Sequence, residues 1–348
     1  MACEQVTLQD VCELIVDCPH TSAKDEGVGY PLIRTPNVGR GRLILTDVHR
    51  VSQDVYERRV SRAVPRQGDL ILAREAPAGN VAIVPPGIEV CLGQRTMLLR
   101  PDSSFVVPEY LNYYLNAPEQ RDRMLRLANG ATVSHINVAD IRNMPVQLPS
   151  RGEQSKVAEL LNVLDDKIDL NNRLNDYLLE LISSVFAHRF SSNVNTTDLK
   201  NVLSISTKAL KPQEHASEIW EHYSIPAFDE KHRPIFEPAS EIKSNKYQID
   251  NECILISKLN PSTKRIWMPY CSSNNAVCST EFIVYRPYLK EYKSFYYAAI
   301  DSPGFTNYLL EHVSGSTGSR QRAQPKDTLH YLMPNPSNEE GSVKPALT

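Results

Sequence analysis

The sequence lacks paired cysteines and long apolar runs. Its seven cysteines are scattered, odd in number and form no C-x-x-C pair, so neither a disulfide framework nor a zinc site is predicted. No run approaches the roughly 18 apolar residues that a membrane span needs, and the first ten residues contain no apolar signal core. We therefore expect a cytoplasmic protein in a reducing compartment, without a membrane partner.

The short motifs of common catalytic sites are also missing. There is no G-x-x-x-x-G-K-[ST] loop, no H-E-x-x-H, and no Asn/Asp-Pro-Pro-aromatic tetrapeptide of the kind that holds a flipped adenine in amino-methyltransferases. The nine histidines show no metal-ligand spacing. Two E-x-K tripeptides, at 241–243 and 291–293, have a form found in nucleases, but Pro101-Asp102, the only Pro-Asp pair, lies in the other half. Surface ion pairs are the preferred interpretation, and no catalytic residue or metal ligand is predicted.

Lysine is scarce in the first half of the chain. Of the 16 basic residues in 1–150, 15 are arginine. Arginine suits planar, bidentate recognition, although surface salt bridges explain the excess about as well. The net charge of −3 argues against a protein that coats nucleic acid without specificity.

Residues 150–190 predict one long helix. Ser150 is the expected N-cap and Glu153 completes a capping box. Apolar residues then recur at steps of four and three on both sides of Asn171-Asn172, which is typical of a coiled-coil seam for a helical partner. The alternative, a core helix of one large domain, fits poorly with so many polar residues. The expected seam consists of Val157, Leu161, Leu164, Ile168, Leu174, Leu178, Leu181 and Val185.

The segments on the two sides of this helix resemble each other in order. Residues 68–85, 89–101 and 128–150 correspond to 251–269, 276–287 and 313–335, and helix-like stretches at 108–128 and 290–313 stand in matching places. The expected fold is α/β (α+β), with two copies of one module joined by a long coiled-coil-type spacer helix. The predicted divisions are 1–149 for the first module, 150–190 for the spacer, 191–335 for the second module and 336–348 for a short disordered tail.

Four segments resemble the specificity subunits of type I restriction-modification enzymes. They are "GDLILAREAPAGNVAIV" (68–84), "NGATVSHINVADIRNMPVQLP" (129–149), the helix "EQSKVAELLNVLDDKIDLNNRLNDYLLELISSVF" (153–186) and "GSTGSRQ" (315–321). The resemblance extends to about residue 335. It implies that each module is a target recognition domain, which reads one half of a split site in double-stranded DNA, and that the helix is a conserved spacer.

The same resemblance implies a non-catalytic chain that binds no cofactor of its own. In this family, modification (methyltransferase) subunits bring S-adenosylmethionine and methylate adenine. A restriction subunit brings ATP-driven translocation and Mg-dependent cleavage. Both kinds of subunit assemble on the specificity subunit.

Loop side chains are the candidates for DNA contact, because arginine and lysine pair with guanine while asparagine and glutamine pair with adenine. Turns are built from similar residues whatever their function, which is the alternative for each position. The candidates in the first module are Arg74, Glu75, Asn80, Asn129, Thr132, Ser134 and His135. Those in the second module are Lys258, Asn260, Ser262, Lys264, Ser316, Thr317, Ser319, Arg320 and Arg322.

Little sequence follows the second module, and Gly341 and Pro345 oppose a second spacer helix there. We therefore expect the apolar seam to pair with a second copy of the chain or to be covered by modification subunits. Two other functions stay open: a stand-alone nuclease that acts on DNA, and a truncated, inactive remnant of a specificity subunit.

Overall fold

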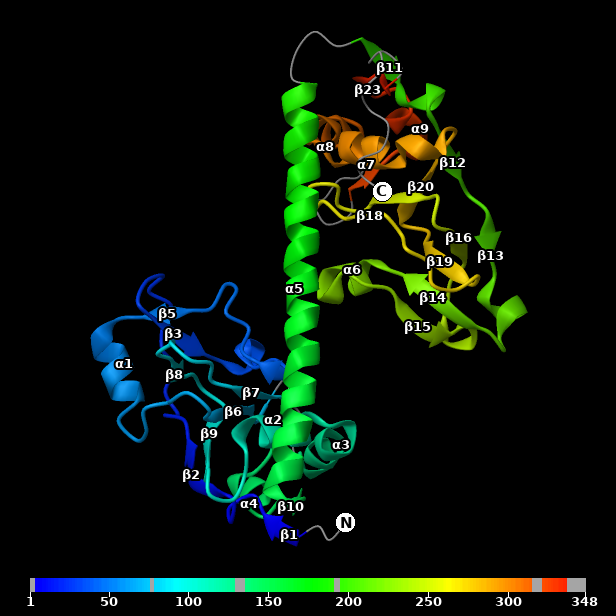
Figure 1. Ribbon diagram of the computed structural model, residues 1–348. Helices are drawn as coiled ribbons and strands as arrows, with labels where there is room; N and C mark the ends of the chain where they lie inside the picture. The colour runs from blue at the N-terminus through cyan, green and yellow to red at the C-terminus, as the bar shows by residue number, and fades with distance from the viewer. Residues whose placement is uncertain (1–3, 76–77, 129–134, 191–194, 315–320, 337–348) are drawn as a thin grey trace. The chain divides into compact units, whose positions relative to one another are not determined.

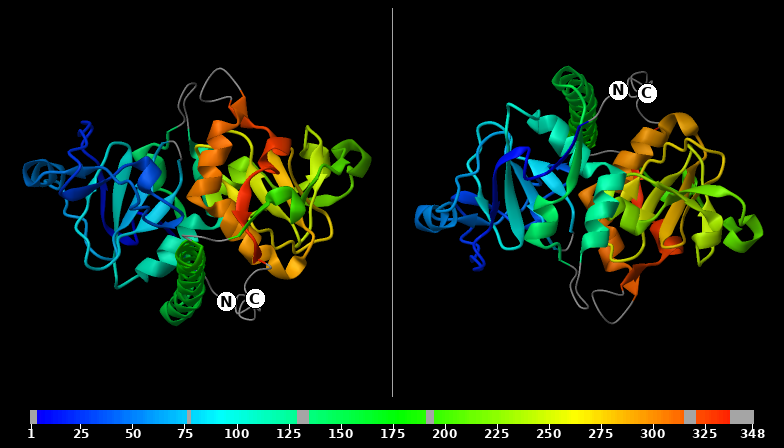
Figure 2. Two further views of the ribbon diagram at one scale, coloured as in Figure 1. Left: turned by 90° about the horizontal axis from the view of Figure 1, so that it is seen from above. Right: turned by 90° about the horizontal axis from the view of Figure 1, so that it is seen from below.

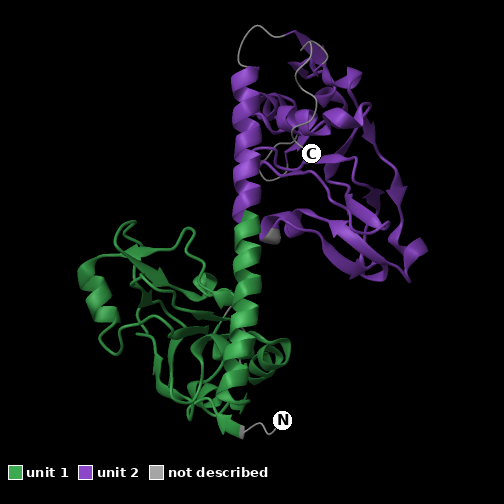
Figure 3. Ribbon diagram, viewed as in Figure 1, with its two compact units in different colours: residues 1–172 green, residues 173–348 purple. Residues whose placement is uncertain are grey.

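The computed structural model describes residues 4–75, 78–128, 135–190, 195–314 and 321–336. It is a mixed α/β structure in which the 39-residue helix α5 (Arg151–Arg189) joins two sheet-rich halves (Figure 1). The chain divides into two compact units, residues 1–172 and 173–348, so that α5 contributes to both (Figure 3). The predicted α/β class and long helix are confirmed. The tail residues 337–348, which include Gly341 and Pro345, lie outside the described residues.

Unit 1 contains two sheets and one separate strand pair. The larger sheet has the order β2 (Cys12–Asp17), β9 (Thr96–Pro101), β6 (Leu70–Ala73), β7 (Val81–Ile83) and β4 (Gly41–Arg42). The smaller has the order β5 (Arg50–Val51), β3 (Tyr30–Ile33) and β8 (Cys91–Leu92), and β1 (Glu4–Thr7) pairs with β10 (Pro145–Leu148). The helices are α1 (Gln53–Arg59), α2 (Pro108–Asn116), α3 (Pro118–Leu127) and α4 (Val138–Arg142), with a 3-10 turn at Thr35–Asn37.

Unit 2 also contains two main sheets. The first has the order β12 (Leu203–Ser206), β20 (Phe282–Pro287), β17 (Ile254–Ser257) and β18 (Ile266–Trp267). The second has the order β13 (Ala209–Leu210), β16 (Lys246–Gln248), β19 (Ala276–Ser279), β14 (Ile219–Tyr223) and β15 (Ile235–Pro238). Two strand pairs are β11 (Thr196–Asp198) with β23 (Leu332–Pro334), and β21 (Val313–Ser314) with β22 (Arg322–Ala323).

The helices of unit 2 follow the same plan as those of unit 1. They are α6 (Ile225–Lys231), α7 (Lys293–Asp301), α8 (Pro303–Glu311) and α9 (Pro325–Thr328). In the described part of unit 2, 3-10 turns span Leu199–Asn201, Pro212–His215, Ala239–Glu241 and Lys290–Tyr292. The pairs α2–α3 and α7–α8 are each interrupted at a proline, Pro118 or Pro303, which begins the second helix because proline lacks the N–H of a helix interior.

The strand order confirms the repeat predicted from the sequence. The order β2-β9-β6-β7 in unit 1 matches β12-β20-β17-β18 in unit 2, and all of these pairings are antiparallel. In the other sheet of each unit, β3 pairs with β8 and β14 pairs with β19, both in parallel. The two units are therefore copies of one module.

The central strand of each module is apolar along its whole length because both of its faces are covered. In β6, Leu70 and Leu72 pack against α2, α3 and α4, while Ile71 and Ala73 enter a second core. In β17, Ile254 and Ile256 pack against α7 and α8, and Leu255 enters the opposite core. Figure 2 shows α7 and α8, in orange, beside the strands of unit 2. No helix among the described residues is long and apolar enough to cross a membrane.

Candidate nucleic-acid interface

The residue after the central strand has the same backbone partners in both modules. In module 1 the Arg74 N–H donates to the Arg95 carbonyl at 2.9 Å, and the Arg74 carbonyl accepts from the Ile136 N–H at 3.1 Å. In module 2 the Lys258 N–H donates to the Glu281 carbonyl, and the Lys258 carbonyl accepts from the Ala323 N–H, both at 2.9 Å. The predicted DNA-contact loop after the central strand therefore begins from the same backbone frame, meaning the same pattern of backbone hydrogen bonds, in both modules.

The side chain of Arg74 is held inside module 1. Its guanidinium lies 2.7 Å from the Asp17 carboxylate and donates from Nε to the Ile136 carbonyl at 2.9 Å. The two ionised side chains are only 15% and 17% exposed. Asp17 ends strand β2 and carries no sequence signal for this role, because it lies 57 residues from Arg74. In this geometry Arg74 orders the loop, and a base contact would require it to leave Asp17.

Asn80 is also placed inside the module. It is 8% exposed; its amide N–H donates to the Val38 carbonyl at 3.0 Å, and its amide oxygen accepts from Arg121 Nε at 3.3 Å. Both polar ends of this side chain are therefore occupied by the protein. Glu75 is half-buried and pairs with the exposed Arg95 at 2.9 Å, while His135 is half-buried.

In module 2 the corresponding lysine has different surroundings. Following the strand register, the position of Asp17 in module 1 corresponds to Thr207 in module 2, which is not ionisable. No carboxylate among the described residues lies within ion-pair distance of the Lys258 ammonium group. The loop after Lys258 continues through Asn260, which has a left-handed backbone with φ of 48°, and the exposed Ser262.

The remaining described candidates of module 2 are ion-paired. Lys264 lies 2.7 Å from the Asp301 carboxylate. Arg322 makes a bidentate contact with Glu281 at 3.0 and 3.2 Å. These pairs are partly exposed, so each contributes little stability and can be exchanged for another anion at low cost. Seven candidates lie outside the described residues: Asn129, Thr132, Ser134, Ser316, Thr317, Ser319 and Arg320.

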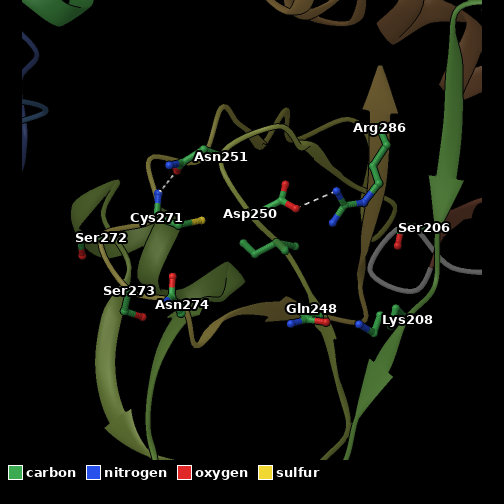
Figure 4. Close-up of a pocket in the computed structure, with 11 residues that line it drawn as sticks. Ser206, Lys208, Gln248, Asp250, Asn251, Cys271, Ser272, Ser273, Asn274 and Arg286 are labelled. Atoms are coloured by element: carbon green, nitrogen blue, oxygen red, sulfur yellow. Dashed lines mark hydrogen bonds and ion pairs between the residues drawn. The ribbon is translucent and has the colours of Figure 1, made fainter. Parts of the chain in front are cut away.

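A polar pocket of about 530 Å³ in unit 2 is lined in part by residues 248–251, which precede β17, and by residues 271–274 (Figure 4). Asp250 and Arg286 form a 2.8 Å ion pair within it, and serine, asparagine and glutamine side chains supply most of the remaining lining. The buried Glu221 holds one wall in place by accepting from the backbone N–H groups of Ser272 and Ser273 at 2.9 and 2.8 Å. None of the described residues that were predicted to contact DNA lines this pocket, and no sequence motif marks it.

The pocket arginine has a counterpart in module 1. By strand register Arg286 corresponds to Arg100, which pairs with the buried Asp69 through contacts of 2.9 and 2.7 Å. The arginine position is thus shared by the two modules, whereas its partners differ in place: Asp69 directly precedes β6, and Asp250 lies four residues before β17. Within the described ranges, no group of three histidine, cysteine or acidic side chains is placed to hold a metal ion.

Helix α5 begins after Ser150, and of the predicted capping box the Glu153 half is formed, while the Glu153 N–H donates to the Ser150 backbone carbonyl rather than to its hydroxyl. The Glu153 carboxylate accepts from the Ser150 N–H at 3.0 Å and from the Ser150 hydroxyl at 2.8 Å, and these bonds lower the pKa of Glu153. The predicted seam faces largely outward: seven of its eight residues are between 40% and 55% exposed, and Leu161 is half-buried. The helix packs on unit 1 through a different, mainly polar face that includes Gln154, Ala158 and Asp165.

Two copies of one α/β module joined by a long helix define a two-module protein that contains an internal duplication. The chain belongs to the family described as the type I restriction modification DNA specificity domain, whose sequence model matches residues 2–180. This match covers the first module and most of α5.

Individual relatives and a solved structure are similar to this chain. The type I restriction enzyme MjaX specificity subunit of Methanocaldococcus jannaschii is 25% identical over 54% of this chain and 45% of its own length. The type I restriction enzyme EcoBI specificity subunit of Escherichia coli is 24% identical over 52% of this chain and 39% of its own length. The match thus spans less than half of the length of these relatives.

The crystal structure of a type I restriction-modification system S subunit from M. genitalium has the same fold. It is 16% identical, with a TM-score of 0.50, and the match covers 89% of this chain and 78% of that chain. The likeness thus extends to the second module.

Proposed function

We propose that this chain is the specificity subunit of a type I restriction-modification system and that it reads a split site in double-stranded DNA, one half-site per module. The observation that carries the proposal is the repeated backbone frame at Arg74 and Lys258, together with the family match. Two similar modules with different side chains in corresponding loops suit a target made of two different half-sites.

Within the loops, some residues hold the loop conformation and others are proposed to contact DNA. Arg74 and Asn80 order the first loop, because their polar atoms are bound within the module. Glu75 and His135 in module 1, and Lys258, Asn260, Ser262, Lys264 and Arg322 in module 2, are the described residues proposed to reach DNA. Residues 129–134 and 315–320 are proposed to complete the two contact surfaces.

The chemistry is proposed to reside in partner subunits. Modification subunits supply S-adenosylmethionine, and a restriction subunit supplies ATP and Mg²⁺. The seam of α5 is proposed as the surface where another helix docks, because leaving apolar surface in water costs ~25 cal/mol per Å². Its occupant is a modification subunit or a second copy of this chain.

The test is methylome sequencing of a methylation-deficient bacterial host that expresses this chain together with the modification subunit of its own system. We expect adenine methylation at one bipartite sequence, and none when this chain is omitted. Methylation at a continuous site would refute the two-module reading. Cleavage of DNA by the purified chain with Mg²⁺ alone would replace the proposal with a nuclease function.

A further inference from the structure

A tight turn in module 1 presents an arginine at its tip. Residues 39–42 reverse the chain, the Gly39 N–H donates to the Arg42 carbonyl at 3.1 Å, and Gly41 adopts φ of 92°. That backbone conformation favours glycine, because a Cβ would be strained there. Arg40 is exposed at the tip of this turn.

Buried amide side chains hold the turn on both sides. Asn112 of α2 is 3% exposed and donates to the Gly41 carbonyl at 2.9 Å. Asn80 donates to the Val38 carbonyl at 3.0 Å. Buried amides with satisfied hydrogen bonds favour one loop conformation, so the turn that carries Arg40 is held in place by side chains from two other parts of the module.

Arg121 of α3 is linked to the same turn through Asn80. Its Nε donates to the amide oxygen of Asn80 at 3.3 Å, so one asparagine joins the turn, its own loop and the helix. Burial lowers the pKa of Arg121, and the neighbouring positive charge of Arg40 lowers it further, with Asp122 acting in the opposite direction. The positive charges of Arg40 and Arg121 therefore lie near each other, on a turn and a helix that Asn80 joins.

The contrast with Arg42, two residues along the turn, is informative. Arg42 is neutralised by Asp166 and Asp169 of α5. Within the part of the chain that the structure describes, no carboxylate lies at ion-pair distance from Arg40 or Arg121. Holding two cations together without a counter-ion is unfavourable in the isolated protein and becomes favourable when an anion bridges them.

We infer that Arg40 and Arg121 form a binding site for one stretch of DNA backbone phosphate, beside the loop that ends at Asn80. Guanidinium groups bind phosphate oxygens through paired hydrogen bonds. Asn80 is a positioning residue for Arg121 and for the turn that carries Arg40, and makes no contact with DNA itself. This inference rests on the proposed function, since it names the residues of module 1 that would set its register on the duplex.

The experiment measures the salt dependence of binding between the full chain and a fluorescein-labelled, mixed-sequence DNA duplex. Each phosphate contact contributes about 0.9 to the slope of log K against log salt. Arg40→Ala with Arg121→Ala should therefore reduce the slope by about 1.8. Arg40→Lys with Arg121→Lys should retain most of it. The matched control is Arg58→Ala with Arg66→Ala, which removes the same charge at two exposed positions.

Asn80→Ala tests the positioning role. It leaves the charge unchanged but removes the hydrogen bonds to Arg121 and to the turn that carries Arg40, so it should reduce the slope by between about 0.9 and about 1.8. In an Arg121→Ala background any further loss should not exceed the contribution of Arg40, or about 0.9. Because Asn80 is buried, a melting curve shows whether each variant is folded, and Arg40→Ala with Arg121→Ala tests the site even if Asn80→Ala does not fold.

The outcomes separate this inference from the function on which it rests. Equal loss of slope in the control and in the Arg40–Arg121 variant would overturn the site and leave DNA binding intact, because the effect would then be that of net charge. An unchanged slope in the Arg40–Arg121 variant would also overturn it. Failure of the folded wild-type chain to bind any duplex, alone or with its modification subunit, would instead refute the proposed function.

Discussion

Arg74 and Lys258 occupy the same place in two copies of one module. Each donates its backbone N–H to the residue just before the neighbouring strand and accepts at its carbonyl from a segment that follows a helix pair. Their side chains differ in surroundings: Asp17 holds Arg74, whereas module 2 has Thr207 at the position of Asp17. Duplication has kept the backbone frame, and substitution has changed what each side chain can bind.

The first prediction follows from that difference. Arg74→Ala removes a partly buried ion pair and a hydrogen bond to the Ile136 carbonyl, leaving Asp17 without its partner. We expect it to lower the free energy of unfolding by about 2 to 3 kcal/mol. Lys258→Ala should cost less than about 1 kcal/mol, because it breaks no described ion pair. Urea denaturation followed by circular dichroism measures both, and equal losses would contradict the assignment of a structural role to Arg74.

The second prediction concerns the division of DNA reading between modules. Glu75→Ala with His135→Ala should relax recognition of one half-site, and Lys258→Ala with Ser262→Ala should relax the other. Losing a base contact costs about 1–3 kcal/mol of discrimination. Binding to duplexes with single base changes in each half-site measures the effect. If both variants relaxed the same half-site, the modules would not divide the target as proposed.

The third prediction concerns how α5 is fastened to module 1. The Tyr113 hydroxyl lies 2.8 Å from the Asp165 carboxylate and 2.9 Å from the Asn162 amide oxygen, and Arg42 pairs with Asp166 and Asp169. Burial raises the pKa of Tyr113, and the hydrogen bond to Asp165 raises it further, so the hydroxyl stays a donor. If this polar face sets the angle at which module 1 meets the spacer, Arg42→Ala with Tyr113→Phe should widen the range of gap lengths accepted between half-sites.

The measurement is binding to a series of duplexes whose half-sites are separated by one to several extra base pairs. Wild type should show one sharp optimum, and the variant a broader one with similar affinity for an isolated half-site of module 1. Arg58→Ala, on the exposed side of α1, serves as the control. A variant with an equally sharp optimum would show that these contacts do not set the gap.

The fourth prediction concerns the seam of α5. Leu164 and Leu178 are 49% and 44% exposed. If another helix covers them, Leu164→Glu with Leu178→Glu should disrupt self-association of the isolated chain or assembly with modification subunits, because a carboxylate in an apolar seam is strongly disfavoured. Light scattering coupled to size exclusion measures both states. Ser155→Glu with Asn172→Glu adds the same charge at exposed polar positions and should leave assembly intact, and a seam variant that assembles normally would exclude this surface.

The candidate site was only partly predictable from the sequence. The loops at 74–80 and 258–264 stand out because they follow apolar strands and match each other in order. The roles of the individual residues in these loops cannot be told from the sequence. Asn80 is a frequent kind of turn residue, and only the approach of Val38 and Arg121 shows that it is enclosed. Arg40, within "VGRGR", carried no signal beyond its two glycines.

The sequence by itself determined the local and periodic features of this protein. Steps of three and four residues specify α5, the contact between Ser150 and Glu153 marks its start, and the apolar runs of β6 and β17 specify strands covered on both faces. Each of these depends on neighbours within a few residues. Only the tertiary structure decided the partners of individual charges: Asp17 for Arg74, Asp166 for Arg42, and none described for Arg40. Those pairings join positions up to 124 residues apart, and no local pattern encodes which of many chemically equivalent carboxylates arrives within reach.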